Sequence, residues 1–201
     1  MQPDAARWGS IGAAVLLLAM LTSCASDTAA VLGEDAGLNG SFEIVEDGLP
    51  VNWAFFPDPS NTESFDVSID SERSLEGRHS IRMAVASDDS DRPPGFRSRR
   101  VPVASGRTYT VSLSAWSDGP ELAVRRIVMD ATKTSNRRSD LIVEARPSSV
   151  DWERYSESLT VAEGEAYVVL IAVVRGEGTI WIDDVRVTET DPSTDEEEAH
   201  E

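Results

Sequence analysis

Hydrophobic and polar residues alternate with a period of two along much of the chain. Successive side chains of a β-strand point to opposite faces, so this alternation predicts strands with one buried face and one polar face. The alternating apolar positions form four runs: Phe65, Val67 and Ile69; Ile81, Met83 and Val85; Val111, Leu113 and Ala115; and Leu122, Val124 and Val128.

A fifth run, residues 166–174 (AYVVLIAVV), is apolar at both odd and even positions. This pattern predicts a central strand covered on both faces, and its β-branched residues favour a strand over the alternative of a helix. Turn-forming residues such as Asp118-Gly119-Pro120 and Gly176-Glu177-Gly178 separate the runs. We therefore expect an all-β fold, an antiparallel β-sandwich of the jelly-roll type.

The N-terminus has the pattern of an export signal. Residues 11–21 (IGAAVLLLAML) are apolar but too few to cross a bilayer, which takes about 20 helical residues. The segment ends in Leu21-Thr22-Ser23-Cys24, which resembles the bacterial lipobox, where the cysteine is lipidated and becomes the mature N-terminus. We expect a signal peptide at 1–23 and a lipid anchor on Cys24. An ordinary secretory signal and an uncleaved anchor are the alternatives.

The rest of the chain divides into three parts by composition. Residues 24–38 are mostly small and polar and predict a tether, and residues 39–187 have the size of one domain. Residues 188–201 carry seven acidic residues without Lys or Arg and predict a disordered tail. These features place the domain in the cell envelope, on the extracytoplasmic side of a membrane that holds the lipid.

The composition excludes several classes of function. With 36 acidic and 18 basic residues the net charge is -18, which disfavours nucleic acid as a partner. Two histidines and one cysteine leave little for a zinc site, a His-dependent triad or a disulfide. The spacing of the carboxylates singles out no glycosidase pair, so we expect that the protein is not an enzyme.

Several short motifs occur in an order that resembles a known family. They are Asn39-Gly40-Ser41-Phe42-Glu43, Pro50-Val51-Asn52-Trp53, Gly106-Arg107-Thr108-Tyr109-Thr110, Trp152-Glu153-Arg154-Tyr155 and Trp181-Ile182-Asp183-Asp184-Val185. This order resembles the carbohydrate-binding modules of families four and nine, which belong to the galactose-binding-like jelly-roll group. The resemblance implies a non-catalytic module that binds a glycan or polysaccharide, often with a structural calcium ion.

The opening and closing motifs supply candidate calcium ligands. If the first and last strands are neighbours, Glu43 meets Asp183 and Asp184, and a hard cation would relieve the repulsion between their carboxylates. The backbone carbonyl of Asn39 or Gly40 is a further candidate. In the alternative interpretation these acids are solvated or paired with an arginine such as Arg82 or Arg186, and no Ca²⁺ is bound.

Sugar binding needs an aromatic or apolar surface and polar groups for the hydroxyls. Trp116 shares the polar parity of its strand and is our candidate stacking platform, with a tryptophan folded over the sheet rim as the alternative. Arg126 shares the apolar alternate positions of Val124 and Val128, where it either contacts a sugar hydroxyl or neutralises Asp130. The remaining tryptophans of the domain occupy positions of the resembled family and are expected to serve packing: Trp53, Trp152 and Trp181.

Two further patches lie in the predicted loops and strand ends. Phe55 and Phe56 are candidates for a second apolar contact with the ligand, or they cap the sandwich. Arg97, Arg99 and Arg100 form a basic patch that suits an acidic glycan or a lipid headgroup, or is a solvated sheet edge. Either patch equally suits an envelope protein as partner, which makes a structural or adhesion module the alternative function.

Overall fold

The structure is a computed structural model that describes residues 37–57, 64–87, 93–132 and 136–190. The predicted signal peptide, Cys24, and most of the predicted tether and acidic tail lie outside the described residues. Within the described residues the regular elements are all β-strands. Those residues contain no helix long and apolar enough to cross a membrane.

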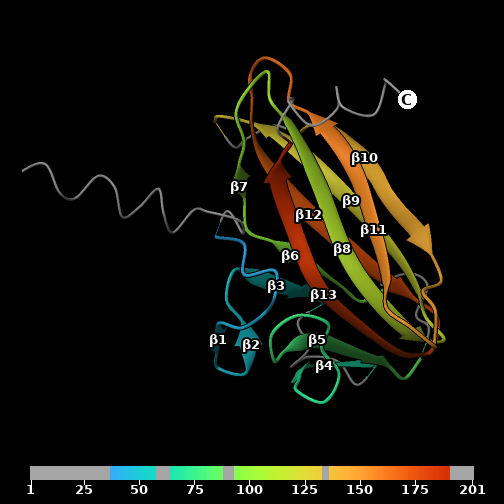
Figure 1. Cartoon of the computed structure of the whole chain (residues 1–201). Coiled ribbons are helices and arrows are strands. Elements are labelled where there is room, and N and C mark those ends of the chain that lie inside the picture. Colours follow the sequence, from blue (N-terminus) through green and yellow to red (C-terminus); the bar gives the residue numbers. More distant parts are fainter. Residues whose placement is uncertain (1–36, 58–63, 88–92, 133–135, 191–201) are drawn as a thin grey trace, which may run out of the picture. The chain divides into compact units, whose positions relative to one another are not determined.

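One antiparallel sheet has six strands. Its order is β10-β9-β12-β6-β3, with β7 paired to β12 beyond the end of β6 (Figure 1). The strands are β3 (Trp53–Phe56), β6 (Gly95–Ser98), β7 (Val101–Pro102), β9 (Glu121–Asp130), β10 (Asn136–Ala145) and β12 (Glu165–Arg175).

The second antiparallel sheet has five strands in the order β11-β8-β13-β5-β4. These strands are β4 (Phe65–Asp70), β5 (Ser80–Val85), β8 (Thr108–Asp118), β11 (Glu153–Thr160) and β13 (Gly178–Glu189). A separate short hairpin precedes both sheets and consists of β1 (Val45–Glu46) and β2 (Leu49–Pro50).

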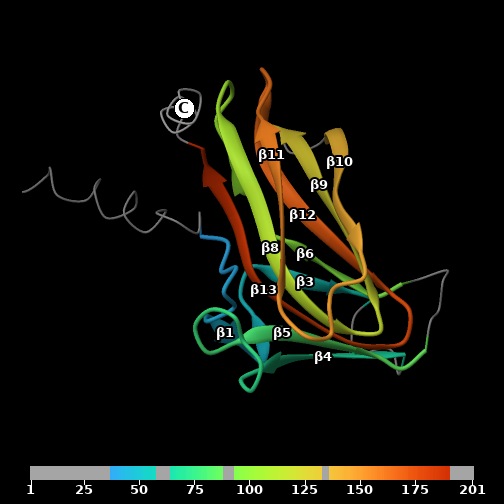
Figure 2. The same cartoon turned by 45° about the vertical axis from the view of Figure 1, so that its right-hand side comes forward.

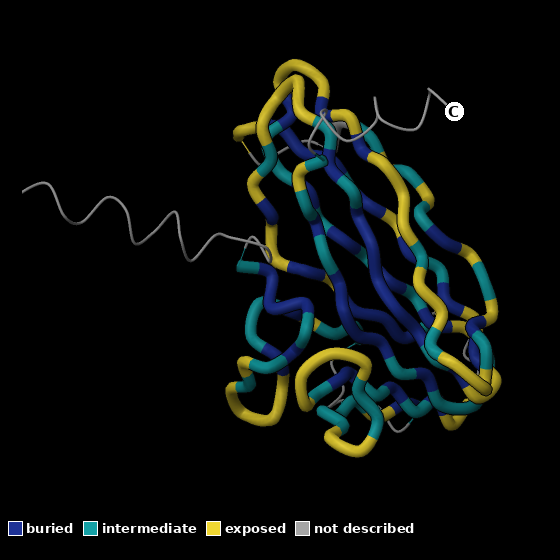
Figure 3. Tube along the Cα trace, viewed as in Figure 1, coloured by how far each residue is buried: buried dark blue, intermediate teal, exposed yellow. Residues whose placement is uncertain are grey.

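The hydrophobic core lies between the two sheets, which Figure 2 shows as two layers. The predicted alternation is confirmed by the buried positions: Val111, Leu113 and Ala115 of β8 point into the core. The core positions that face them from the six-stranded sheet include Leu122 and Val124 of β9. Figure 3 shows this burial along the middle of the long strands. The predicted antiparallel sandwich is thus confirmed.

The central strand β12 departs from the prediction in one respect. It does lie inside its sheet, between β9 and β6, but only one of its faces is covered. Val168 and Leu170 point into the core, whereas Val169, Ile171 and Val173 on the opposite face are only half-buried. The expectation of a strand covered on both faces is therefore wrong. A single sandwich has no third layer to cover this second apolar face.

The segment that opens the domain contacts the last strand. The amide of Val185 in β13 donates a hydrogen bond of 3.0 Å to the carbonyl of Gly40. A β-bulge between Asp183 and Arg186, with Asp184 at a φ of 52°, frees this amide from the pairing with β8. Gly40 is required here because a Cβ atom would lie 1.7 Å from the Val185 carbonyl oxygen. The first and last segments are thus neighbours, which is the condition that the candidate calcium site requires.

Candidate ligand-binding face

The outward side chains of the six-stranded sheet form rows that run across its strands. In one row Ala54 of β3 pairs with Arg97 of β6, and Arg97 pairs with Ile171 of β12. Ile171 pairs on its other side with Arg125 of β9. In the next row Val169 pairs with Ile127. We call this outer surface, carrying Arg97, Arg125, Ile127, Val169 and Ile171, the pocket face.

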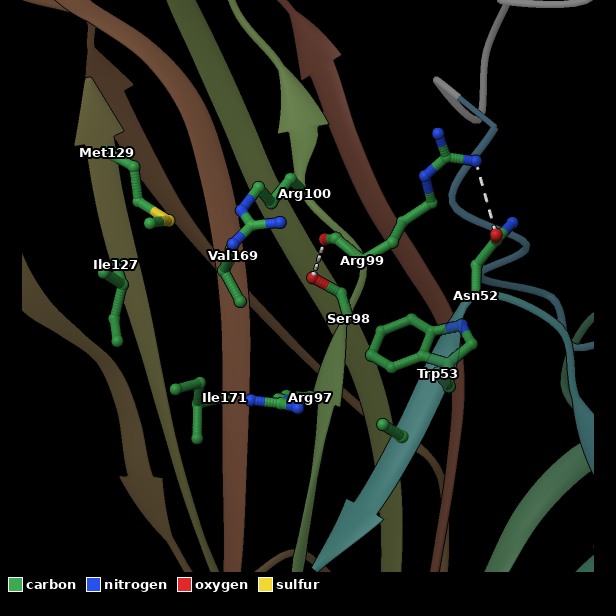
Figure 4. Close-up of a pocket in the computed structure, with 11 residues that line it drawn as sticks. Asn52, Trp53, Arg97, Ser98, Arg99, Arg100, Ile127, Met129, Val169 and Ile171 are labelled. Atoms are coloured by element: carbon green, nitrogen blue, oxygen red, sulfur yellow. Dashed lines mark hydrogen bonds between the residues drawn. The ribbon is translucent and has the colours of Figure 1, made fainter. Parts of the chain in front are cut away.

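A pocket of about 520 Å³ is hollowed into the pocket face. Its size falls within the range of about 300 to 1,000 Å³ that is usual for small-ligand sites. The apolar side of the pocket is made by Ile127, Met129, Val169 and Ile171 from β9 and β12 (Figure 4). Its other side comes from residues 52–54 and 97–100, so four strands and two strand connections build it.

The break between β6 and β7 brings two more arginines to the pocket. Ser98 ends β6 with its side chain buried, where its hydroxyl accepts a hydrogen bond of 2.9 Å from the amide of Leu170 and donates one of 2.7 Å to the carbonyl of Arg99. The backbone then leaves the ladder, and the Arg99 amide bonds the carbonyl of Asn52. Arg99 and Arg100 consequently project beside the pocket, as Figure 4 shows.

The alternative that the basic patch is a solvated sheet edge does not hold for Arg97. Arg97 lies on β6, which is hydrogen-bonded to β12 on one side and to β3 on the other. An interior strand has no free edge to protect, so discouraging strand addition does not explain these arginines. Their guanidinium groups instead border an apolar pocket.

Trp116 lies on the outer face of the opposite, five-stranded sheet. Its ring makes an edge-on contact with Trp181, with ring centroids 4.9 Å apart. The guanidinium carbon of Arg73 lies 3.6 Å from the centroid of the Trp116 ring, so one face of this ring is covered. Trp116 points outward, as predicted from its place among the polar alternate positions of its strand. Sugar stacking on Trp116 remains a prediction, and it would require Arg73 to move or to contact the sugar itself.

Arg126 points inward and is 7% exposed. It bonds the Asp140 carboxylate on β10 at 3.2 Å and donates a hydrogen bond of 2.6 Å to the carbonyl of Ser158 on β11. Its charge is thus neutralised by Asp140, where the sequence had suggested Asp130. The guanidinium joins the edge strands of the two sheets.

The two phenylalanines of β3 lie on opposite faces. Phe55 packs toward the core beside Phe96, with ring centroids 6.2 Å apart. Phe56 pairs with Gly95 on the outer face, where a Cβ atom at position 95 would lie 2.6 Å from the Phe56 ring. Of the four predicted sugar contacts, Trp116, Arg126, Phe55 and Phe56, only Phe56 lies on the same sheet face as the pocket.

Of the candidate calcium ligands, Asp183 and Asp184 lie at the bulge in the middle of β13 and Glu43 lies in the opening segment, and protein groups already bond all three carboxylates. Glu43 Oε1 accepts hydrogen bonds from the amides of Arg78 and His79, and these bonds lower its pKa although burial opposes them. Asp184 is ion-paired with Arg154 and Arg186, the second of which the sequence analysis had named as an alternative partner.

Asp183 is completely buried, and its Oδ2 accepts hydrogen bonds from the amides of Leu75 and Glu76. Burial raises its pKa to about 6 in spite of these hydrogen bonds. Among the described residues no group of three or more His, Cys, Asp or Glu side chains is placed to hold one ion. Backbone carbonyls such as that of Gly40 would therefore have to supply most ligands, and calcium remains a prediction.

The pocket face was not identified from the sequence, because the apolar residues of β12 predicted a strand covered on both faces. The available signal was the mixture of arginine and aliphatic residues at alternate positions of neighbouring strands, which place their side chains on one face of the sheet. Arg125 and Ile127 of β9 share that parity, as do Val169 and Ile171 of β12. Recognising it required the register between the two strands, which the sequence does not state.

Comparisons with known proteins support the fold class. No family model matches the chain, and no curated protein matches it. Among solved structures, the xylan-binding domain CBM22-1 of Paenibacillus barcinonensis Xyn10C is similar, with a TM-score of 0.51 and 12% identity over 75% of this chain and 91% of that one. The enzymatically active domain of bacteriophage CBA120 tailspike protein 4 gives a TM-score of 0.59 and 18% identity over 78% of this chain.

A third similar structure contains the CBM22-1 and GH10 modules of a Clostridium thermocellum xylanase, complexed with xylohexaose. Its TM-score is 0.52 at 14% identity over 69% of this chain. Our chain spans only 26% of that xylanase chain and 22% of the tailspike chain. At these identities the similarity establishes the fold, and the predicted jelly-roll class is confirmed.

Proposed function

We propose that this protein is a non-catalytic glycan-binding module and that the pocket face holds the glycan. The observation that carries the proposal is a 520 Å³ pocket whose apolar floor is bordered by exposed arginines. A sugar ring has an apolar face that packs on aliphatic or aromatic side chains, and hydroxyl groups that accept hydrogen bonds from guanidinium groups. The pocket offers both kinds of contact within one surface.

The similarity to two structures that contain carbohydrate-binding modules supports this proposal. One is described as a xylan-binding domain and the other is complexed with xylohexaose. We assign polysaccharide binding to our chain by this likeness together with the pocket. The tailspike similarity points to a domain described as enzymatically active, so the absence of turnover is itself part of the proposal.

We further propose that a lipid on Cys24 anchors the module to a membrane on the extracytoplasmic side of the cell envelope. The support is the apolar run at 11–21 followed by a sole cysteine in a lipobox-like context. Acyl chains contribute about 0.8 kcal/mol for each buried methylene, so several chains hold a protein stably at a membrane. Mass spectrometry of the membrane fraction tests this, because Cys24→Ala should abolish a lipid-modified N-terminus.

Affinity electrophoresis of the full chain through gels containing xylan or other polysaccharides tests glycan binding. Ile171→Glu places a charge on the pocket floor at a half-exposed position, so it should remove retardation while the protein stays folded. Trp116→Ala is the matched variant on the opposite sheet and should leave retardation intact. Retardation lost only in Trp116→Ala would instead support the tryptophan platform. Release of reducing sugar would contradict the non-catalytic proposal.

An envelope protein as partner is the second candidate. The observation that favours it is the aliphatic floor formed by Ile127, Val169 and Ile171, because the core of a protein–protein interface is also apolar. Indifference to every polysaccharide, together with crosslinking of the pocket face to a protein in intact cells, would favour this structural or adhesion function over glycan binding.

A further inference from the structure

Most arginines in the described part of this acidic protein are paired with carboxylates. The chain has twice as many acidic as basic residues, so partners are abundant. The ion pairs formed by arginines include Arg82 with Asp66, Arg107 with Glu189, Arg126 with Asp140, Arg138 with Glu165, Arg146 with Glu121, Arg154 with Asp184 and Arg175 with Glu144. An arginine without such a partner is therefore the exception among the residues that the structure describes.

Arg73, which stacks on Trp116 of the five-stranded sheet, is one exception among the described residues, and the other four lie on the pocket face. Within the part of the chain that the structure describes, Arg97, Arg100 and Arg125 form no ion pair with a carboxylate, and Arg99 bonds only the amide oxygen of Asn52, at 3.3 Å. All four side chains are exposed. Arg97 and Arg125 flank Ile171 in one row across three strands, which puts their Cα atoms roughly 10 Å apart.

Four unneutralised cations on one face repel one another. The described residues of the sheet place no carboxylate among them, although acidic side chains occur elsewhere on the same surface: Glu121 and Glu144 are paired with Arg146 and Arg175. A ligand that carries negative groups relieves this repulsion. The planar guanidinium binds carboxylate and sulfate groups through two parallel hydrogen bonds, which a neutral hydroxyl cannot match.

We infer that the pocket face selects an acidic polysaccharide, one that carries uronate carboxylates or sulfate groups. In this arrangement the sugar rings lie on Ile127, Val169 and Ile171, and the anionic groups meet Arg97 and Arg125 on either side of this floor. Arg99 and Arg100 extend the positive surface to the β6–β7 break. This inference rests on the proposed function and names the chemical class of its ligand.

The chain's overall charge makes anion binding at the pocket face selective. At -18 the protein repels polyanions in general, so an acidic glycan binds only where the local field is reversed. Binding of this kind weakens as salt screens the charges, whereas packing on the apolar floor is little affected. Salt dependence of the affinity therefore separates an acidic ligand from a neutral one.

The test measures the affinity of the full chain for glucuronoxylan or polygalacturonate and for the same polymer after its carboxyl groups are reduced to alcohols. We expect at least about tenfold tighter binding to the acidic form, equivalent to one strong charge-assisted contact. Equal affinity for both polymers would overturn the inference and leave glycan binding standing. The inference would also be overturned if the chain bound neither the acidic polymer, nor its reduced form, nor any of a panel of sulfated glycans. Binding to no glycan at all would overturn both the inference and the proposed glycan-binding function.

Variants locate the effect. Arg97→Gln combined with Arg125→Gln should bring the acidic polymer to the affinity of its reduced form, and Arg97→Lys with Arg125→Lys should retain part of the preference. Arg82→Gln removes the same charge from the other sheet and should change little; an equal loss there would show general electrostatics and contradict a local site.

Binding to phosphatidylglycerol vesicles without binding to acidic glycans would assign the surface to a membrane and overturn the inference. Thermal unfolding monitored by circular dichroism confirms that each variant is folded.

Discussion

The indole nitrogen of Trp181 on β13 donates a hydrogen bond of 2.7 Å to Oδ2 of Asp70 at the end of β4. The other carboxylate oxygen of Asp70 accepts hydrogen bonds from the amides of Glu72 and Arg73, which start the connection to β5. Asp70 thereby holds together the outer surface of the five-stranded sheet. The side chain of Arg73 continues from this turn to cover Trp116 and Trp181.

This arrangement predicts a specific dependence of stability on pH. Burial acts to raise the pKa of Asp70, but the hydrogen bonds from Trp181 and the two amides outweigh it and hold the pKa below its ordinary value of 3.8. A carboxyl group whose pKa is lower in the folded state stabilises the fold above its unfolded-state pKa. Its contribution is therefore complete above about pH 4 and is lost as the pH falls through the folded-state pKa.

Urea unfolding between acid and neutral pH measures this contribution. Asp70→Asn should lower the free energy of unfolding at neutral pH and flatten its fall in acid. Asp66→Asn on the same strand is the control, because Asp66 forms only an exposed ion pair with Arg82 and such pairs contribute little. An unchanged acid slope in Asp70→Asn would show that the Trp181 contact does not set this dependence.

The buried guanidinium of Arg126 predicts a stability effect without a binding effect. Arg126→Ala leaves the Ser158 carbonyl and the Asp140 carboxylate without their partner, which should cost about 2 kcal/mol of unfolding free energy. The penalty stays moderate because Asp140 is partly exposed and can be solvated. Polysaccharide affinity measured below the unfolding transition should not change. A selective loss of affinity in a stably folded variant would instead make Arg126 a ligand contact.

Two glycines near the start of the domain form a matched pair. Gly40→Ala should destabilise the fold by more than about 3 kcal/mol, because its Cβ atom would overlap the Val185 carbonyl and force the opening segment off β13. Gly48→Ala meets no neighbour within 4 Å and only the strain of a φ of 80°, which costs about 1 kcal/mol. Thermal unfolding compares the two. Equal effects would show that the contact between Gly40 and Val185 is not required.

Calcium is tested by the dependence of the melting temperature on free metal. If the predicted ion is bound, calcium should raise the melting temperature and EDTA should lower it, since a ligand specific for the folded state stabilises it. Glu43→Ala alone does not decide the question, because Glu43 also accepts hydrogen bonds from Arg78 and His79. The informative result is whether Glu43→Ala removes the response to calcium. No shift with calcium or EDTA in the unmodified protein would contradict the ion.

The fold was predictable from the sequence because alternation reports directly on which side of a strand is buried. Phe65 and Met83 show it in β4 and β5, where both point into the core. Proximity of the chain's opening and closing motifs, which the sequence analysis took as a condition, is realised by the hydrogen bond between Gly40 and Val185. Neither inference needed to know which strand pairs with which.

The candidate site was not predictable in the same way, because it depends on pairing and register. Ile171 is 46 residues from Arg125 in the chain yet lies opposite it, and Arg97 reaches the same row from a third strand. Trp116 was the natural choice by parity, but parity cannot reveal that Arg73 covers its ring. Long-range pairing decides these neighbours, and the local pattern carries no information about it.

Mapping backbone amide shifts by NMR during titration with an acidic oligosaccharide tests the central claim most directly. The account predicts that the shifted amides cluster on β6, β9 and β12, around Arg97, Ile127 and Ile171. A cluster around Trp116 and Trp181 on the five-stranded sheet, or no saturable shifts with any oligosaccharide, would contradict it.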